Sequence, residues 1–152
     1  MASFKGQKAL SPAYMAGDGR AVHIVDKIVL GASPGVGTPA GADTIDFLIP
    51  GGFRLTGLKL VSDDIDTGAA LLYGVGYRPV STADGSLAAS TAYFAAAGQT
   101  TFRAAGATSF DFKPIKFEQD VYISILIGTA MAGVSGNPEI HMIASGNAEG
   151  QK

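Results

Sequence analysis

The sequence predicts an all-β fold, a β-sandwich of jelly-roll type with at most one short helix. Two observations support this fold class. Short segments of alternating apolar and polar residues recur from residue 21 onward, and turns rich in Gly, Pro and Asp separate them. The 152 residues, 47% of them hydrophobic, suffice for one packed core. We therefore expect a single sandwich domain over residues 21–152, preceded by an extended N-terminal arm over residues 1–20.

The alternation predicts the strands in order along the chain. The expected strands are 21–31, 44–50, 53–62, 70–77, 100–106, 108–117, 120–129 and 140–145. Within 53–62 the apolar row changes register at Gly57, which indicates a β-bulge. Pro114 is expected to interrupt 108–117, because proline has no N–H to donate. The strands 120–129 and 140–145 are expected to form a hairpin with a long loop.

One segment departs from the alternation. Residues 87–97 are rich in alanine, and Gly98 follows where a helix would end. The segment therefore predicts either one short helix or an irregular connection.

The composition excludes several function classes. Charged residues make up only 16% of the chain and the formal net charge is -2, so nucleic acid is not an expected partner. The absence of cysteine excludes disulfides, zinc–thiolate sites and cysteine catalysis. No apolar segment approaches a membrane span, and the first residues lack the apolar core of a signal peptide. We expect no membrane partner and synthesis in the cytoplasm.

The segment "DDIDTG" at residues 63–68 contains the Asp-Thr-Gly signature of aspartic proteases. A retropepsin-like dimer would use Asp66 from each subunit, the two carboxylates sharing a proton. The apolar pair and glycine at 126–128 fit a second element of that family. Against this interpretation, three carboxylates lie within four residues, and the chain lacks a glycine-rich flap between the two elements. The alternatives are a turn, in which Gly68 adopts positive φ, and a calcium loop.

The remaining candidate sites are weak. His23 and His141 lie far apart in predicted strands, which favours half-buried strand residues over metal ligands. Tyr73, Tyr77 and Tyr93 could bind sugars only if they formed a flat exposed platform. The serines and glycines match neither a nucleophile elbow nor a phosphate-binding loop. We therefore expect no enzyme activity, no metal and no cofactor.

Three stretches together resemble a known family. They are "FRLTGLKLVSDDIDTGAALLYGVGY", "STAYFAAAGQTTFRAAG" and "DVYISILIGTAMAGVSGNPEIHMIA", within residues 45–144. Their order is similar to that in the capsid decoration, or cement, proteins of tailed bacteriophages. The resemblance implies a noncatalytic β-sandwich that binds the outside of the expanded phage head and bridges neighbouring capsomers. The N-terminal portion of this chain, residues 1–44, is longer than in the family pattern. The mode of attachment to the capsid is therefore left open.

The resemblance also implies partners. We expect a homo-oligomer, either a dimer or a trimer, bound to the major capsid protein on the outer surface of the virion. Within the arm, Phe4, Leu10, Tyr14 and Arg20 are the candidate contacts with the capsid or with other subunits. The alternative within the same class is another virion component, such as a head-fibre, neck or tail protein.

Overall fold

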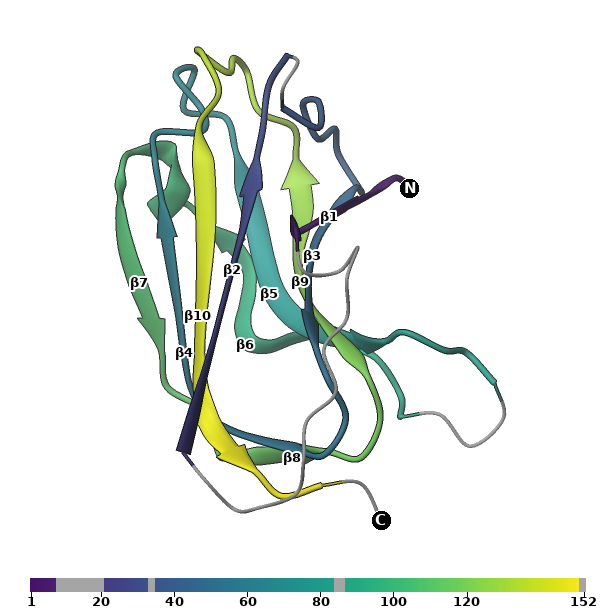
Figure 1. Cartoon of the computed structure of the whole chain (residues 1–152). Helices are drawn as coiled ribbons and strands as arrows, with labels where there is room; N and C mark the ends of the chain where they lie inside the picture. Colours follow the sequence, from purple (N-terminus) through teal and green to yellow (C-terminus); the bar gives the residue numbers. More distant parts are fainter. Residues whose placement is uncertain (8–20, 33–34, 84–86, 151–152) are drawn as a thin grey trace.

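Two β-sheets pack face to face in the computed structural model, which describes residues 1–7, 21–32, 35–83 and 87–150 (Figure 1). The first sheet has the order β1 (Ser3–Lys5), β3 (Thr44–Ile49), β9 (Val121–Thr129), β5 (Leu72–Pro79), β6 (Ser90–Gln99). The second has the order β2 (Ala21–Val29), β10 (Glu139–Ala148), β4 (Phe53–Ser62), β7 (Gly106–Phe110), and the short β8 (Ile115–Phe117) pairs with the start of β4. A 3-10 segment, η2 (Thr101–Arg103), follows β6.

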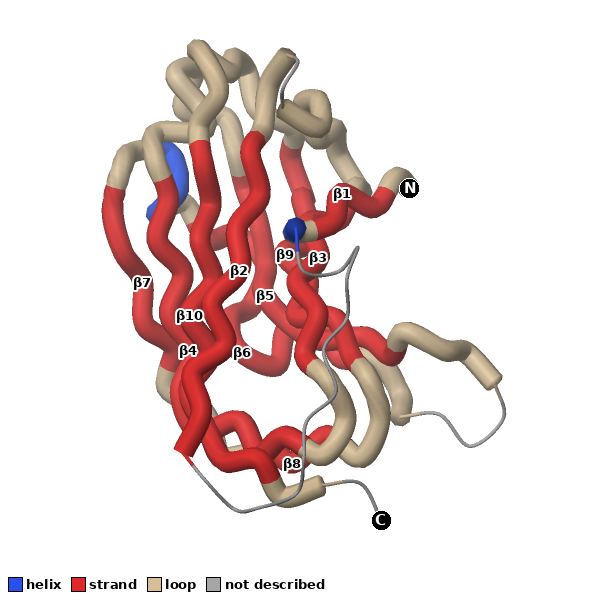
Figure 2. The backbone as a smooth tube through the Cα atoms, viewed as in Figure 1, coloured by secondary structure: helices blue, strands red, loops and turns tan. Residues whose placement is uncertain are grey.

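The order of the strands is that of a jelly roll. With β1 and β8 set aside, each sheet has four strands, all paired antiparallel. The chain passes from one sheet to the other at almost every step, so that β2, β4, β7 and β10 alternate with β3, β5, β6 and β9. Figure 2 shows strands and connecting loops through the described chain, with the short 3-10 segment η2 beside β7. The predicted all-β sandwich is confirmed.

The core lies between the sheets and is formed by alternate residues of each strand. On β9, the isoleucines Ile123, Ile125 and Ile127 are at most 1% exposed. Phe47 of β3 and Val75 of β5 are fully buried beside them. The apolar rows predicted for 44–50, 70–77 and 120–129 are therefore confirmed. Burial of each such side chain contributes roughly 1.5–3 kcal/mol.

Two predicted interruptions are also present. The register of β10 against β4 shifts between Ser145 and Gly146, and Ser145 pairs with Gly57, so the bulge lies where the apolar row changes phase. Pro114 separates β7 from β8. Proline has no N–H to donate to a ladder, and glycine within a strand often marks a bulge.

The expected hairpin of the last two strands is wrong. β9 lies in the first sheet between β3 and β5, whereas β10 lies in the second sheet between β2 and β4. Residues 130–138 cross from one sheet to the other at the end of the sandwich drawn at the top of Figure 1. Alternation identifies the buried face of a strand but not its neighbours, so closeness along the chain was a poor guide here.

The alanine-rich segment, expected to be a short helix or an irregular connection, is mostly strand instead, because residues 90–99 form β6. β6 is an edge strand whose register with β5 shifts twice. The glycines of "YGVGY" make this possible. A Cβ on Gly74 would lie 3.3 Å from Cα of Ala97, and a Cβ on Gly76 would lie 2.5 Å from the carbonyl carbon of Thr91. The expected strand at 100–106 is replaced by η2, whose Phe102 is buried.

The N-terminal strand belongs to the sandwich. β1 pairs in parallel with β3, so residues 3–5 of the expected arm extend the edge of the first sheet. Leu10, Tyr14 and Arg20 lie outside the described residues. In the part of the chain that the structure describes, no helix is long and apolar enough to span a membrane.

Candidate interaction surface

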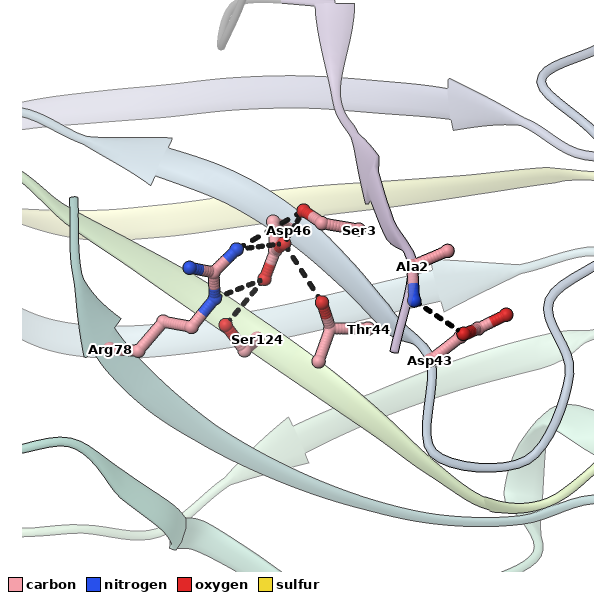
Figure 3. Close-up of polar contacts among 7 residues, drawn as sticks. All are labelled: Ala2, Ser3, Asp43, Thr44, Asp46, Arg78 and Ser124. Atoms are coloured by element: carbon pink, nitrogen blue, oxygen red, sulfur yellow. Dashed lines mark hydrogen bonds and ion pairs between the residues drawn. The ribbon is translucent and has the colours of Figure 1, made fainter.

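A buried aspartate on β3 holds the N-terminal strand (Figure 3). Asp46 is 0% exposed, although it points away from the core, level with Ser124 on β9. Its carboxylate accepts hydrogen bonds from the hydroxyls of Ser3, of Thr44 at 3.0 Å and of Ser124 at 2.5 Å. A buried carboxylate is tolerated only with such partners. Asp46 therefore ties β1 to two strands of the first sheet.

Arg78 of β5 supplies the opposite charge. Its Nη2 lies 2.6 Å from one oxygen of Asp46 and its Nε lies 3.3 Å from the other, and Nη2 also donates to Ser3 at 3.1 Å. The guanidinium lies over the ring of Tyr122 at 4.8 Å, and the Lys5 ammonium lies 5.2 Å from the same ring. Removal of one partner of a buried ion pair costs about 3–5 kcal/mol. Because the Arg78 side chain is 35% exposed, we expect about 2–3 kcal/mol here.

A second carboxylate fixes the start of the chain. Asp43 accepts hydrogen bonds from the backbone N–H of Ala2 at 2.6 Å and from that of Ala40 at 2.8 Å. These donors stabilise the charged carboxylate and hold the pKa of Asp43 below its usual value. The backbone N–H of Thr44 in turn donates to the carbonyl of Ala2. Both the N–H and the carbonyl of Ala2 are therefore hydrogen-bonded, which fixes the start of the chain.

Phe4 and Gly6 fit β1 against the core. Phe4, one of the predicted contact residues, is half-buried and packs on the hydrophobic core of its own chain. The backbone N–H of Gly6 donates to the carbonyl of Asp46 at 2.7 Å. A Cβ at this glycine would overlap the carboxylate of Asp26 and lie 2.7 Å from Phe47. We call the site that receives β1 the β1 socket; its residues are Asp43, Thr44, Asp46, Arg78 and Ser124.

Sequence reasoning missed the β1 socket. The available signal was an aspartate in the middle of "TIDFLIP". A charged residue on the solvent face of a half-buried strand is ordinary, so this pattern did not distinguish a buried site from an exposed one.

The segment "DDIDTG" forms a turn around a buried Asp66, which is 1% exposed. One carboxylate oxygen accepts the backbone N–H of Leu71 at 2.5 Å. The other accepts those of Ala132 at 2.8 Å and of Gly68 and Gly133, both at 3.3 Å. Burial works to raise the pKa of Asp66, but the backbone donors outweigh it and hold the pKa below its usual value. The charged carboxylate thus clamps the turn to the loop that follows β9.

This geometry favours the turn over the protease interpretation. A protease carboxylate must contact water and share a proton with a second carboxylate. Asp66 is shielded within its own chain, and backbone amides engage both of its oxygens. One detail of the turn differs from expectation: Ala69 adopts positive φ, at 53°. Gly68 is required instead by close approach, because a Cβ there would overlap the side chain of Ala132.

The calcium interpretation lacks a gathered set of ligands. Asp63 accepts the backbone N–H of Glu139 at 2.8 Å, and Asp64 accepts that of Asp66 at 3.1 Å. Asp63 and Asp64 thus each accept a hydrogen bond from a backbone N–H group. Over residues 1–7, 21–32, 35–83 and 87–150, no three His, Cys, Asp or Glu side chains lie together as metal ligands would.

Both histidines lie on strands of the second sheet and have local partners. Nδ1 of His23 is 2.9 Å from the hydroxyl of Ser145, and Nε2 of His141 is 2.8 Å from the carboxylate of Glu139. Glu139 also accepts a hydrogen bond from Lys27 at 2.8 Å, which together with His141 lowers the pKa of Glu139. These contacts are cross-strand or same-strand surface pairs.

The tyrosine platform that sugar binding requires is not formed. Tyr73 is 1% exposed and stacks on Phe102 with ring centroids 4.3 Å apart. Tyr77 is 8% exposed and packs edge-on against Tyr93 at 5.3 Å. Tyr73 and Tyr77 belong to the core and Tyr93 is half-buried against it, so the three rings do not form the flat exposed platform that sugar binding requires.

The surface also carries open hollows. One, of about 290 Å³, is lined by Val80, Glu118 and Asp120 among others. Its carboxylates are engaged, Glu118 by Lys116 at 3.0 Å and Asp120 by the backbone of Gly51 at 2.8 Å. Another, of about 380 Å³, lies over the bulge in β4 and is lined mainly by small and polar residues.

The sequence matches no protein-family model and no curated protein. Two solved structures share its fold. A chain from the capsid of Ralstonia phage GP4 superimposes with a TM-score of 0.66 at 20% identity, over 99% of this chain and 100% of that one. A chain from the capsid asymmetric unit of cyanophage Pam1 superimposes with a TM-score of 0.61 at 19% identity, over 90% of each chain. This chain therefore has the fold of chains found in two phage capsid structures.

Proposed function

We propose that this chain is a non-enzymatic structural protein of a phage virion, which binds the outer surface of the head and cements neighbouring capsomers. The observation that supports this most is the match to the GP4 capsid chain, which covers 99% of this chain and 100% of the other. The matched chain is therefore about as small as this one. A matched chain of this size fits a decoration protein. The motif order from residues 45 to 144 supports the same function independently.

The physics of a cement protein agrees with the described residues. Such a protein binds the assembled shell but not its free subunits, so binding stabilises the assembly by mass action. Each contact can be weak, because repeated display on a lattice gives a high effective concentration. The buried carboxylates Asp46 and Asp66 hold a strand and a loop in place. They give the surface a fixed shape, which lowers the entropic cost of docking.

The partners are the major capsid protein and further copies of this chain, as a dimer or trimer at a symmetry axis of the shell. A content of 16% charged residues favours close packing of copies on the lattice. Phe4, Leu10, Tyr14 and Arg20 remain the proposed contacts with the capsid or with neighbouring subunits. Of these, Phe4 would make its contact as part of β1.

The number of copies per virion tests this proposal against the alternative of a head-fibre, neck or tail component. We expect quantitative mass spectrometry of purified virions to give on the order of hundreds of copies, because a cement protein follows the lattice of the shell. A count of roughly a dozen or fewer would instead indicate a ring at a single vertex.

A further inference from the structure

We infer that β1 is exchanged between neighbouring copies of this chain, so that the β1 socket of each copy receives the N-terminal strand of another. This inference deepens the proposed function by naming the element that joins one copy to the next. The inference rests on the proposed function in one respect, because the phage shell is what brings copies of this chain close together.

The β1 socket specifies an N-terminal strand but not the chain that supplies it. Asp46 receives the Ser3 hydroxyl, Asp43 receives the Ala2 N–H, and the edge of β3 receives the backbone of β1. Without a strand in place, Asp43 and Asp46 each lose a donor and β3 becomes a bare sheet edge. The same contacts form with a strand from either source, so exchange changes little in energy.

The chain between β1 and β2 is long enough to reach a neighbour. β1 ends at Lys5 and β2 begins at Ala21, which leaves the 15 residues 6–20 between them. At about 3.3 Å per residue, such a segment can extend to roughly 50 Å. A folded domain of this length has a radius of gyration of about 15 Å, hence a diameter of roughly 40 Å. An adjacent copy therefore lies within reach.

β1 can also leave its socket without unfolding the sandwich. Phe4 is the one residue of β1 that packs against the hydrophobic core, and it is only partly buried. Its other described contacts are hydrogen bonds at the edge of the first sheet and the contact of Lys5 with the ring of Tyr122. Local opening of a terminal strand requires far less free energy than global unfolding.

Local concentration decides which strand occupies the socket. The covalent link to β2 presents a chain's own strand at an effective concentration of about the millimolar range. Neighbouring copies packed side by side present their strands at a comparable concentration. We therefore expect closed monomers in dilute solution and exchanged strands where copies are crowded.

Cross-linking between chains tests the exchange, and the absence of native cysteine makes the readout clean. Ser3→Cys is placed in one chain and Thr44→Cys in another of different mass, because these residues are direct partners across β1 and β3. The two proteins are mixed at millimolar concentration, oxidised and analysed by intact-mass spectrometry. A matched control pairs Ser3→Cys with Val25→Cys, an exposed position on β2 in the other sheet.

We expect the Ser3→Cys and Thr44→Cys mixture to give covalent heterodimers at least five-fold above the control. The inference is overturned if its yield equals that of the control while a single chain carrying both substitutions closes on itself. Isotope-filtered nuclear Overhauser measurements on a mixture of labelled and unlabelled native protein decide the question without substitutions. They should show contacts between Phe4 of one chain and Ile45 of another, and contacts within single chains only would refute exchange.

These tests need no capsid, so they separate the inference from the proposed function. Exchange in solution with no binding to heads would contradict the function alone. Binding to heads with every β1 in its own socket would contradict the exchange alone.

Discussion

Replacement of Asp66 by asparagine is expected to destabilise the fold by about 2–6 kcal/mol, because it leaves two buried donors without an acceptor and each such donor costs about 1–3 kcal/mol. The carboxylate accepts Leu71 on one oxygen and Gly68, Ala132 and Gly133 on the other. Asparagine has the same shape but replaces one oxygen with an amide NH₂. In the less harmful orientation that NH₂ faces the N–H of Leu71, so the bond from Leu71 is lost and both groups are left as unpaired buried donors.

Urea denaturation followed by circular dichroism measures this change, and thermal melts should show a Tm lower by roughly 5–20 °C. Asp111→Asn is the matched control, since the same chemical change at an exposed carboxylate should stay within about 0.5 kcal/mol. If Asp66→Asn is no more destabilising than Asp111→Asn, Asp66 does not clamp the turn. A peptidase assay at acid pH on the same samples should show no activity, and activity that Asp66→Asn abolishes would restore the protease interpretation.

Three further predictions concern other parts of the molecule. Arg78→Gln should cost about 2–3 kcal/mol, because the buried Asp46 loses its cation, and hydrogen exchange in β1 should accelerate; unchanged exchange would show that the ion pair does not hold β1. Gly76→Ala should displace β6, because the added methyl meets the backbone of Thr91, and should lower stability by about 1–3 kcal/mol in urea titrations; wild-type stability would refute the close approach. The folded pKa of Asp66 lies below its ordinary value of 3.8, so its stabilising contribution is fully present above pH 3.8 and is lost as the pH falls through the folded pKa. The urea midpoint should therefore fall in acid, and more steeply for the native protein than for Asp66→Asn.

Local pattern predicted the strands well because the pleat imposes a period of two on any half-buried strand. The rows through Phe47, Val75 and Ile125 and the bulge at Gly57 all follow from that period. Which strands lie next to each other in a sheet is decided by packing between residues far apart in the chain. The alternation of apolar and polar residues carries no information about that choice. This is why β9 and β10 were expected to form a hairpin but lie in different sheets.

The alanine-rich segment shows how tertiary context overrides propensity. Alanine favours helices, yet Ala95 and Ala97 lie in a strand that crosses close to the glycines of β5. Small side chains suit that position because two backbones approach closely there. Gly74 and Gly76 carried the relevant signal, which becomes interpretable only when the neighbouring strand is known.

The β1 socket could not be predicted, because it joins residues far apart in the chain. Asp46 is buried only because Ser3, Arg78 and Ser124 converge on it from β1, β5 and β9. The reverse holds for Asp66, whose turn chemistry is largely local and was recognised as one of the open interpretations. Its tie to Ala132, however, spans 66 residues and required the structure.

Binding of the purified protein to expanded phage heads that lack it tests the proposed function most directly. The heads are sedimented with increasing amounts of protein, and the bound copies are counted at saturation. We expect saturable binding, on the order of hundreds of copies per head, together with greater resistance of the heads to heat. Heads that bind no protein at saturating concentration, or that bind it without saturation, would contradict a role as a cement protein.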